Sequence, residues 1–173
     1  TIINQAIQEL NLEVTYVLEE SLFPAKFLPF KSYTDLYDNS PIQVIIDQTR
    51  SQPVDLRFYL EILNDSTFKL KASGEEVTLY DYVSNRPVGY LDSLNFFGLY
   101  RFGEKISGKS YDFIIYKTEH FNPNNLKDKN LFFFFNNLFF LTLDYQGSLN
   151  IATTSTTSSV VTISLVGTHP KKI

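Results

Sequence analysis

Residues 131–145 read LFFFFNNLFFLTLDY, the densest run of large apolar side chains in the chain. Two adjacent asparagines, Asn136 and Asn137, interrupt the run at its centre. Asparagine tolerates the positive φ angles of tight turns, so the pattern predicts a β-hairpin with a two-residue Asn-Asn turn between aromatic strands. In that register Phe134 lies opposite Phe139, and aromatic cross-strand pairs of this kind add about 0.2–1 kcal/mol each.

Two helical alternatives fit this run less well. A membrane-spanning helix needs about 20 consecutive apolar residues, whereas this run has about 13 before Asp144 and contains two asparagines. A buried soluble helix stays open, but it would place Asn136 and Asn137 in an apolar shell, where each unmet hydrogen bond costs a few kcal/mol. The hairpin is therefore the preferred interpretation, and no membrane span is expected.

The predicted hairpin lacks the alternation of apolar and polar residues that marks a half-exposed strand. One apolar face can meet the domain's own core, and the other must then meet a second layer or another subunit. The loop FPAKFLPF at residues 23–30 is also apolar and contains two prolines. The residues expected at an interface with other subunits are Phe132, Phe134, Phe139, Leu141, Phe23, Phe27 and Phe30.

The composition is that of a globular protein. The chain of 173 residues is 43% hydrophobic and 20% charged, so we expect one domain over residues 1–173 with a substantial core. A net charge of −4 and a pI near 5.1 argue against nucleic acid as the main partner, because phosphate binding needs clustered lysine and arginine. The absence of cysteine excludes disulfides, thiol catalysis and cysteine metal sites.

The rest of the chain alternates short strands with turns. Residues 1–11 suit a short amphipathic helix or arm, and residues 167–173 form a tail. Residues 64–66 and 73–75 are interpreted as turns, and Gly98 as a candidate β-bulge. This spacing is typical of an all-β fold, either an antiparallel β-sandwich (jelly-roll-like) or a barrel of about 8–11 strands. Strands are expected at residues 12–18, 42–47, 54–63, 67–72, 77–83, 94–102, 111–118, 149–151 and 160–166.

Residues 103–110 read GEKISGKS and match the phosphate-binding loop pattern G-x-x-x-x-G-K-S. That pattern binds phosphate when a helix starts at the Lys-Ser pair and aims its N-terminal amides at the ligand. Here the continuation at 111–118, YDFIIYKT, has the period-two pattern of a strand. We therefore interpret the segment as a hairpin loop with Lys109 in solvent, and we expect no cofactor.

His120 and His169 are the only histidines. His120 follows Glu119 at the end of a predicted strand, which would permit a general base, but no G-x-S-x-G motif nominates a serine partner. A metal site would need more ligands than two distant histidines supply. A hydrolase that uses His120 is thus a minor alternative, and no catalytic or metal site is expected.

Other polar residues have ordinary explanations. Asp35, Asp38 and Asn39 could contribute oxygens to calcium, but the spacing of a calcium loop is absent, so a turn with Asx caps is preferred. Asn64 begins an N-x-S glycosylation sequon, which matters only in a secreted protein. Exposed tyrosines could stack on sugars, although packing roles are favoured. These tyrosines are Tyr80, Tyr82, Tyr90 and Tyr100.

Three functions are in keeping with these patterns. The preferred one is a non-enzymatic structural subunit of a large protein assembly, most of all a virus or phage particle (capsid, tail or appendage), with a virion or extracellular location. Its support is indirect: strands that are apolar on both faces resemble obligate interfaces, which look like a core cut in half. The second is a β-sandwich module that binds carbohydrate or a small apolar ligand. The third is the hydrolase.

Overall fold

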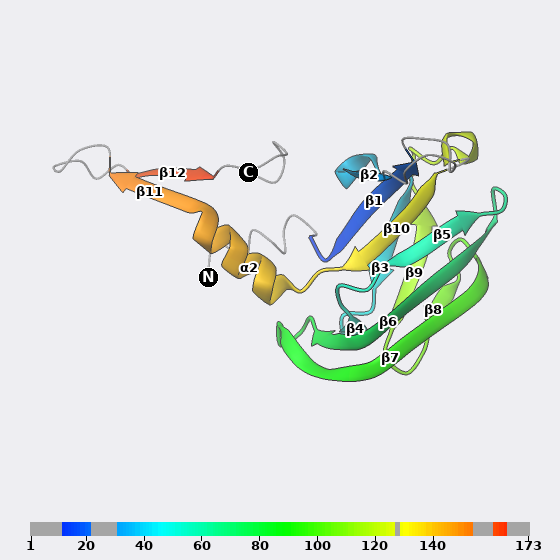
Figure 1. The fold of residues 1–173 in the computed structure, drawn as a ribbon, viewed down its shortest axis with the longest axis horizontal. Helices are drawn as coiled ribbons and strands as arrows, with labels where there is room; N and C mark the ends of the chain where they lie inside the picture. The colour runs from blue at the N-terminus through cyan, green and yellow to red at the C-terminus, as the bar shows by residue number, and fades with distance from the viewer. Residues whose placement is uncertain (1–11, 22–30, 127–128, 154–160, 166–173) are drawn as a thin grey trace. The chain divides into compact units, whose positions relative to one another are not determined.

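The computed structural model describes residues 12–21, 31–126, 129–153 and 161–165 (Figure 1). The chain divides into two compact units, of which the larger spans residues 12–137. The second unit contains the described residues from Leu138 onward. Each unit is described by itself, and the single domain expected over the whole chain stays a prediction.

Three expected features lie outside the described residues: the helix or arm at 1–11, the apolar loop at 23–30 and the tail at 167–173. The N-terminal placement of the helix is not borne out. The α-helix that the structure does describe is C-terminal, α2 (Leu138–Ser148). The all-β class is confirmed, because antiparallel strands dominate the described chain.

The larger unit contains two antiparallel sheets, which we call the large sheet and the small sheet (Figure 1). The described strands form no closed barrel, so the barrel alternative is wrong, while the jelly-roll-like topology stays a prediction. The large sheet has the order β2 (Lys31–Asp35), β1 (Val14–Ser21), β10 (Asn130–Phe135), β5 (Phe58–Ile62), β6 (Thr67–Asp81) and β4 (Gln52–Pro53), with β7 (Arg86–Arg101) paired to β6. The small sheet has the order β3 (Ile42–Ile46), β9 (Asp112–Lys117) and β8 (Lys105–Ser107). Two short 3-10 helices are η1 (Tyr37–Asn39) and η2 (Pro123–Leu126).

The described part of the second unit consists of α2 followed by two strands that pair as an antiparallel hairpin. The hairpin joins β11 (Leu149–Thr153) to β12 (Val161–Leu165). Strands were expected at 149–151 and 160–166, and β11 and β12 confirm them. The threonine and serine run between them contributes its first residues to β11.

The core of the sandwich is a cluster of four phenylalanine rings from both sheets. Phe58 stacks on Phe133 with ring centroids 5.1 Å apart and planes 8° apart. Phe113, from the small sheet, lies 5.5 Å from Phe58 and 5.4 Å from Phe135. Each of the four rings is at most 1% exposed. Since full burial of such a side chain contributes about 1.5–3 kcal/mol, this cluster is a main source of the attraction between the sheets.

The hairpin expected at 131–145 is wrong in its second half. Its first half is β10, which pairs with β1 and β5, so that Phe134 lies opposite Thr15. Its second half is the helix α2. Asn136 shows why no turn forms, because its side-chain amide donates to the Leu12 carbonyl at 2.6 Å and to the Thr15 hydroxyl at 2.8 Å. Asn136 thus connects the ends of β1 and β10 by side-chain hydrogen bonds instead of forming a turn.

The chain itself covers both faces of β10. Phe133 faces the core, while Phe132 lies on the opposite face of the large sheet. There the Phe132 ring lies 5.1 Å from the ring of Tyr59, and the guanidinium of Arg57 lies 5.1 Å from the Phe132 centroid. Because Phe132 is only 2% exposed, it gives no reason to expect a partner layer over this strand.

The turn expected at 73–75 is also wrong, because β6 runs unbroken through it and pairs with β7 along its length. Gly74 serves close packing there, since a Cβ at that position would lie 2.7 Å from Leu56 Cδ1. Gly98 sits in regular register opposite Leu70 and is not a bulge. The two expected short strands and the strand expected at 94–102 are parts of one long β-hairpin (Figure 1).

Other strands follow the expected pattern more closely. Those expected at 42–47 and 111–118 are confirmed as β3 and β9. The strand expected at 54–63 is shorter, because Asp55 adopts a φ of 61° and its N–H donates to the Phe135 carbonyl at 2.9 Å. The backbone therefore turns before β5 begins.

Candidate functional site

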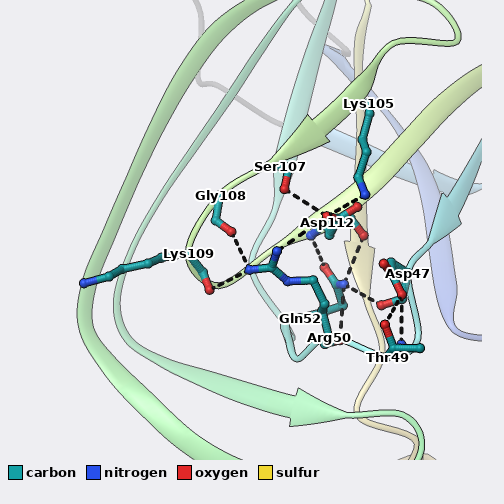
Figure 2. A network of polar contacts seen from close by, with 9 residues as sticks. All are labelled: Asp47, Thr49, Arg50, Gln52, Lys105, Ser107, Gly108, Lys109 and Asp112. Atoms are coloured by element: carbon teal, nitrogen blue, oxygen red, sulfur yellow. Dashed lines mark hydrogen bonds and ion pairs between the residues drawn. The ribbon is translucent and has the colours of Figure 1, made fainter.

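The GEKISGKS segment at 103–110 contains β8 and the turn into β9, beside the buried carboxylate of Asp112 (Figure 2). The Asp112 side chain is 3% exposed, and its Oδ2 lies 3.1 Å from Lys105 Nζ and 3.8 Å from Arg50 Nη1. The Ser107 hydroxyl donates to the same oxygen at 2.8 Å. One buried negative charge is thus matched by two cations and a hydroxyl.

Gln52 of β4 joins this cluster to the large sheet. It is 0% exposed, and its Oε1 accepts from the Asp112 N–H at 3.0 Å. Its Nε2 donates to the carbonyls of Asp112 at 3.0 Å and Asp47 at 3.2 Å. These bonds hold β4 of one sheet to β9 of the other. We call the whole set the Asp112 network: Asp47, Thr49, Arg50, Gln52, Lys105, Ser107, Gly108, Lys109 and Asp112 (Figure 2).

The geometry confirms the hairpin interpretation of GEKISGKS and opposes a phosphate-binding loop. The Gly108 N–H donates to the Tyr111 carbonyl at 2.9 Å, which closes the turn. Strand β9 starts at Asp112, so no helix N-terminus follows the Lys-Ser pair. Lys109 is exposed, and Figure 2 shows its side chain extending away from the network. The cluster is a structural link between sheets.

His120 is a surface residue. Its side chain is 42% exposed, and its Nε2 lies 3.7 Å from Glu119 Oε1. Its backbone N–H donates to the Thr118 hydroxyl at 3.2 Å. The structure adds no catalytic partner to this pair within the described chain, and His169 lies outside that part. The hydrolase alternative therefore stays a prediction.

The remaining polar candidates belong to turns. Asn64 Oδ1 accepts from the Ser66 N–H at 2.8 Å and from the Thr67 N–H at 3.0 Å, which is an Asx turn. The Asx-capped turn expected around Asp35, Asp38 and Asn39 is not found: Asp35 is the last residue of β2, and η1 holds Asp38 and Asn39 with Leu36 as its N-cap and no side-chain cap hydrogen bond. In the ranges that the structure describes, no three histidine, aspartate or glutamate side chains are grouped so that they could hold a metal ion.

The tyrosines expected to be exposed divide into two kinds. That expectation is wrong for Tyr80 and Tyr82, which are 0% and 4% exposed. The Tyr82 hydroxyl donates to the Asn136 carbonyl at 2.8 Å, and burial raises the pKa of Tyr82 above its ordinary value. Tyr100 is half-buried, whereas Tyr90 is 73% exposed on β7. Tyr90 is thus the most accessible of the four.

Large apolar side chains are exposed along β7. Phe97 is 73% exposed and Leu99 is 62% exposed, in addition to Tyr90. Among the described strands β7 pairs with β6 alone, so one side of its backbone is an open sheet edge (Figure 1). We call this feature the β7 edge. This edge was not predicted, because the aromatic run at 94–102 indicates a strand but not its place at the border of a sheet.

The residues predicted to form an interface fall in different settings. Phe132 is buried, as described above, and Phe134 is half-buried. On α2, Leu141 is half-buried and Phe139 is 44% exposed. Leu143, which was not predicted, is 47% exposed on the same helix. The other three, Phe23, Phe27 and Phe30, lie outside the described residues.

Comparison with known proteins finds no protein-family model that matches this chain and no curated protein with significant similarity to it. Within the described ranges, no helix has both the length and the apolar character that crossing a membrane requires. The functional argument therefore rests on the geometry of the described surfaces.

Proposed function

We propose that this chain is a non-enzymatic, jelly-roll-like β-sandwich subunit of a larger protein assembly, and a virus or phage particle is the kind of assembly we favour. Its partners are other protein subunits, either copies of this chain or different chains. The observation that supports the proposal best is the exposed apolar β7 edge. A virion or extracellular location goes with the proposal.

The β7 edge has the properties of an interface. Protein sheets usually protect a long edge with lysine, proline, a bulge or a covering segment, because unpaired backbone groups invite another strand. Between Pro87 and Arg101 the only charged residue of this strand is Asp92. Covering Leu99 would contribute about 1.5–3 kcal/mol if the side chain became fully buried. Apolar side chains beside an open edge therefore favour association.

Sedimentation velocity of the purified chain over a range of concentrations tests the proposal. We expect species larger than the monomer, with a proportion that rises with concentration. Leu99→Lys should weaken this association about tenfold or more, because a charge would have to lose its water at the interface. Circular dichroism of the variant checks that the sandwich stays folded.

A matched control lies on the small sheet. Ile45 of β3 is 46% exposed, so Ile45→Lys adds the same charge to a different apolar surface and should leave association unchanged. A wild-type chain that stays monomeric at every concentration would contradict assembly through copies of itself. If Ile45→Lys dissociates the assembly and Leu99→Lys does not, the interface lies on the small sheet and not at the β7 edge.

A further inference from the structure

The outer face of the large sheet, which faces away from the small sheet, is hollowed in two places. The larger hollow has a volume of about 750 Å³ and the smaller about 430 Å³, within the usual range for ligand sites. Tyr59 of β5, Lys71 of β6 and Phe97 of β7 line both hollows. The two hollows therefore meet at these three residues and form one groove across three strands.

The three shared residues form a row across the sheet. Tyr59 pairs with Lys71, and Lys71 pairs with Phe97, in the registers of the adjacent strands. Lys71 Nζ lies 5.9 Å from the Tyr59 ring centroid. Since neighbouring strands are about 4.8 Å apart, Lys71 has an aromatic residue beside it on each of the two adjacent strands. The row offers apolar ring faces and one cation to the same ligand.

Lys71 differs from the other lysines of the groove. Four lysines and two glutamates line the larger hollow, which gives it an excess of positive charge in a chain whose net charge is −4. Within the described residues Lys71 has no carboxylate partner, so its charge is available to a ligand. The other three lysines form ion pairs: Lys31 with Glu19, Lys69 with Glu61 and Lys129 with Glu20.

A buried carboxylate lies in the wall of the larger hollow. Glu19 is 3% exposed, and its Oε1 accepts from Asn130 Nδ2 at 2.9 Å and pairs with Lys31 Nζ at 2.9 Å. Its Oε2 is buried and makes no hydrogen bond in the described part of the chain.

We propose that this groove binds an acidic saccharide, with the ligand's carboxylate on Lys71 and its sugar rings against Tyr59 and Phe97. The exposed carboxylate of Glu61 can accept a hydrogen bond from a sugar hydroxyl, and together with Glu19 it repels a phosphate or polyanion, which favours a ligand with a single carboxylate. The smaller hollow adds the Ser73–Asn95 pair, joined by a hydrogen bond of 2.7 Å, beside the same aromatic row. The groove thus has room for more than one sugar unit.

This inference goes beyond assembly and does not depend on it. Pairing through the β7 backbone would occur at the border of the sheet, whereas the groove lies on its outer face. Leu99→Gln separates the two, because Leu99 lines neither hollow and a neutral amide adds no charge beside Lys69, the groove residue opposite it in register. Loss of association in that variant with unchanged saccharide binding would show that the two properties are independent.

Titration of the full, isotope-labelled chain by NMR tests the proposal. The acidic probes are 3′-sialyllactose and 6′-sialyllactose, each with one carboxylate, and the uncharged probes are lactose and 3′-galactosyllactose. We expect the acidic probes to cause saturable shifts at Tyr59, Lys71 and Phe97, and the uncharged probes to bind about tenfold more weakly or worse, because a charge-assisted hydrogen bond contributes about 1.5–3 kcal/mol.

Two variants locate the site. Lys71→Gln should weaken the acidic probes about tenfold while leaving the uncharged ones unchanged, and Phe97→Ala should weaken both classes. Lys109→Gln, an exposed lysine on the β8–β9 turn, is the matched control and should change nothing.

Three results would overturn the proposal. One is the absence of shifts with either acidic probe up to about 10 mM. Another is equal affinity of the wild-type chain for acidic and uncharged saccharides, or equal affinity of Lys71→Gln and the wild-type chain for the acidic probes. The third is inorganic phosphate that causes the same shifts with equal or higher affinity, which would identify a simple anion site.

Discussion

Asp112 carries the buried charge of the network through which Gln52 joins the two sheets. Its carboxylate is buried, but Lys105 and Arg50 balance it and Ser107 donates a hydrogen bond to it. Both cations are more than 40% exposed, so water screens part of the attraction. The hydrogen bonds and the exclusion of water from Asp112 itself therefore carry most of its contribution.

Asp112→Asn is expected to lower the free energy of unfolding by about 1–2 kcal/mol, because it removes a buried charge that two cations need. Urea unfolding followed by circular dichroism measures the change. Asp92→Asn, at an exposed position of β7, is the control and should shift the free energy by less than about 0.5 kcal/mol. Equal stability of Asp112→Asn and wild type would show that the network is dispensable.

Gly98 provides a second test at the scale of one residue. A Cβ at this position would overlap the ring of Tyr100, whose ring is stacked on Phe96 with centroids 5.9 Å apart. Gly98→Ala should therefore cost about 1–3 kcal/mol of unfolding free energy, as overpacking usually does. Gly89→Ala on the same strand has no neighbour within 4 Å and should be close to neutral. Similar stability of the two variants would contradict this packing.

At the scale of elements, the pairing of β1 with β2 and β10 depends on Glu19. Burial raises the pKa of Glu19, but hydrogen bonds from Lys31 and Asn130 and the charge of Lys31 outweigh burial, so the pKa lies below its ordinary value of 4.5. Because the folded state lowers this pKa, the stabilisation is fully present above the ordinary value. It is lost as the pH falls through the lowered value.

Glu19→Gln should therefore destabilise the chain by about 1–2 kcal/mol near pH 7, and the difference from wild type should shrink as the pH falls below the ordinary carboxyl pKa. Urea unfolding of both proteins between neutral and acidic pH measures this. Glu75→Gln, an exposed carboxylate on β6, serves as the control. A difference between Glu19→Gln and wild type that persists at the acid end would mean that shape rather than charge is responsible.

The run at 131–145 contains one element that its sequence predicted and one that it did not. Strand β10 was predictable, because a continuous aromatic run fits a strand covered on both faces. The helix α2 was not, since its residues are apolar on every side and carry neither a helical nor a strand period. The position of Asn136 was equally ambiguous, because an asparagine that suits a turn also suits a hydrogen bond to a distant strand.

At the scale of the whole molecule, the larger unit has its own core. The four central phenylalanines and the Asp112 network all lie within residues 12–137. A fragment of residues 12–137 is therefore expected to fold alone, with dispersed NMR amide signals and cooperative urea unfolding. A fragment of residues 12–110, which lacks β9 and β10, is the control and should stay unfolded. Failure of the longer fragment to fold would mean that the sandwich needs the remaining residues.

The order of residue types along the chain was sufficient to predict an all-β fold, several strands such as β3 and β9, and the hairpin at GEKISGKS. These depend on local alternation and turn chemistry, which neighbouring residues carry. Three-dimensional packing was needed for the rest. Packing divides residues 131–145 between a strand and a helix, and it covers Phe132 with side chains of the same chain. It also aligns Tyr59, Lys71 and Phe97 in one row. Each of these results depends on which distant strands become neighbours, and pairing energies between distant segments leave no periodic trace in the sequence.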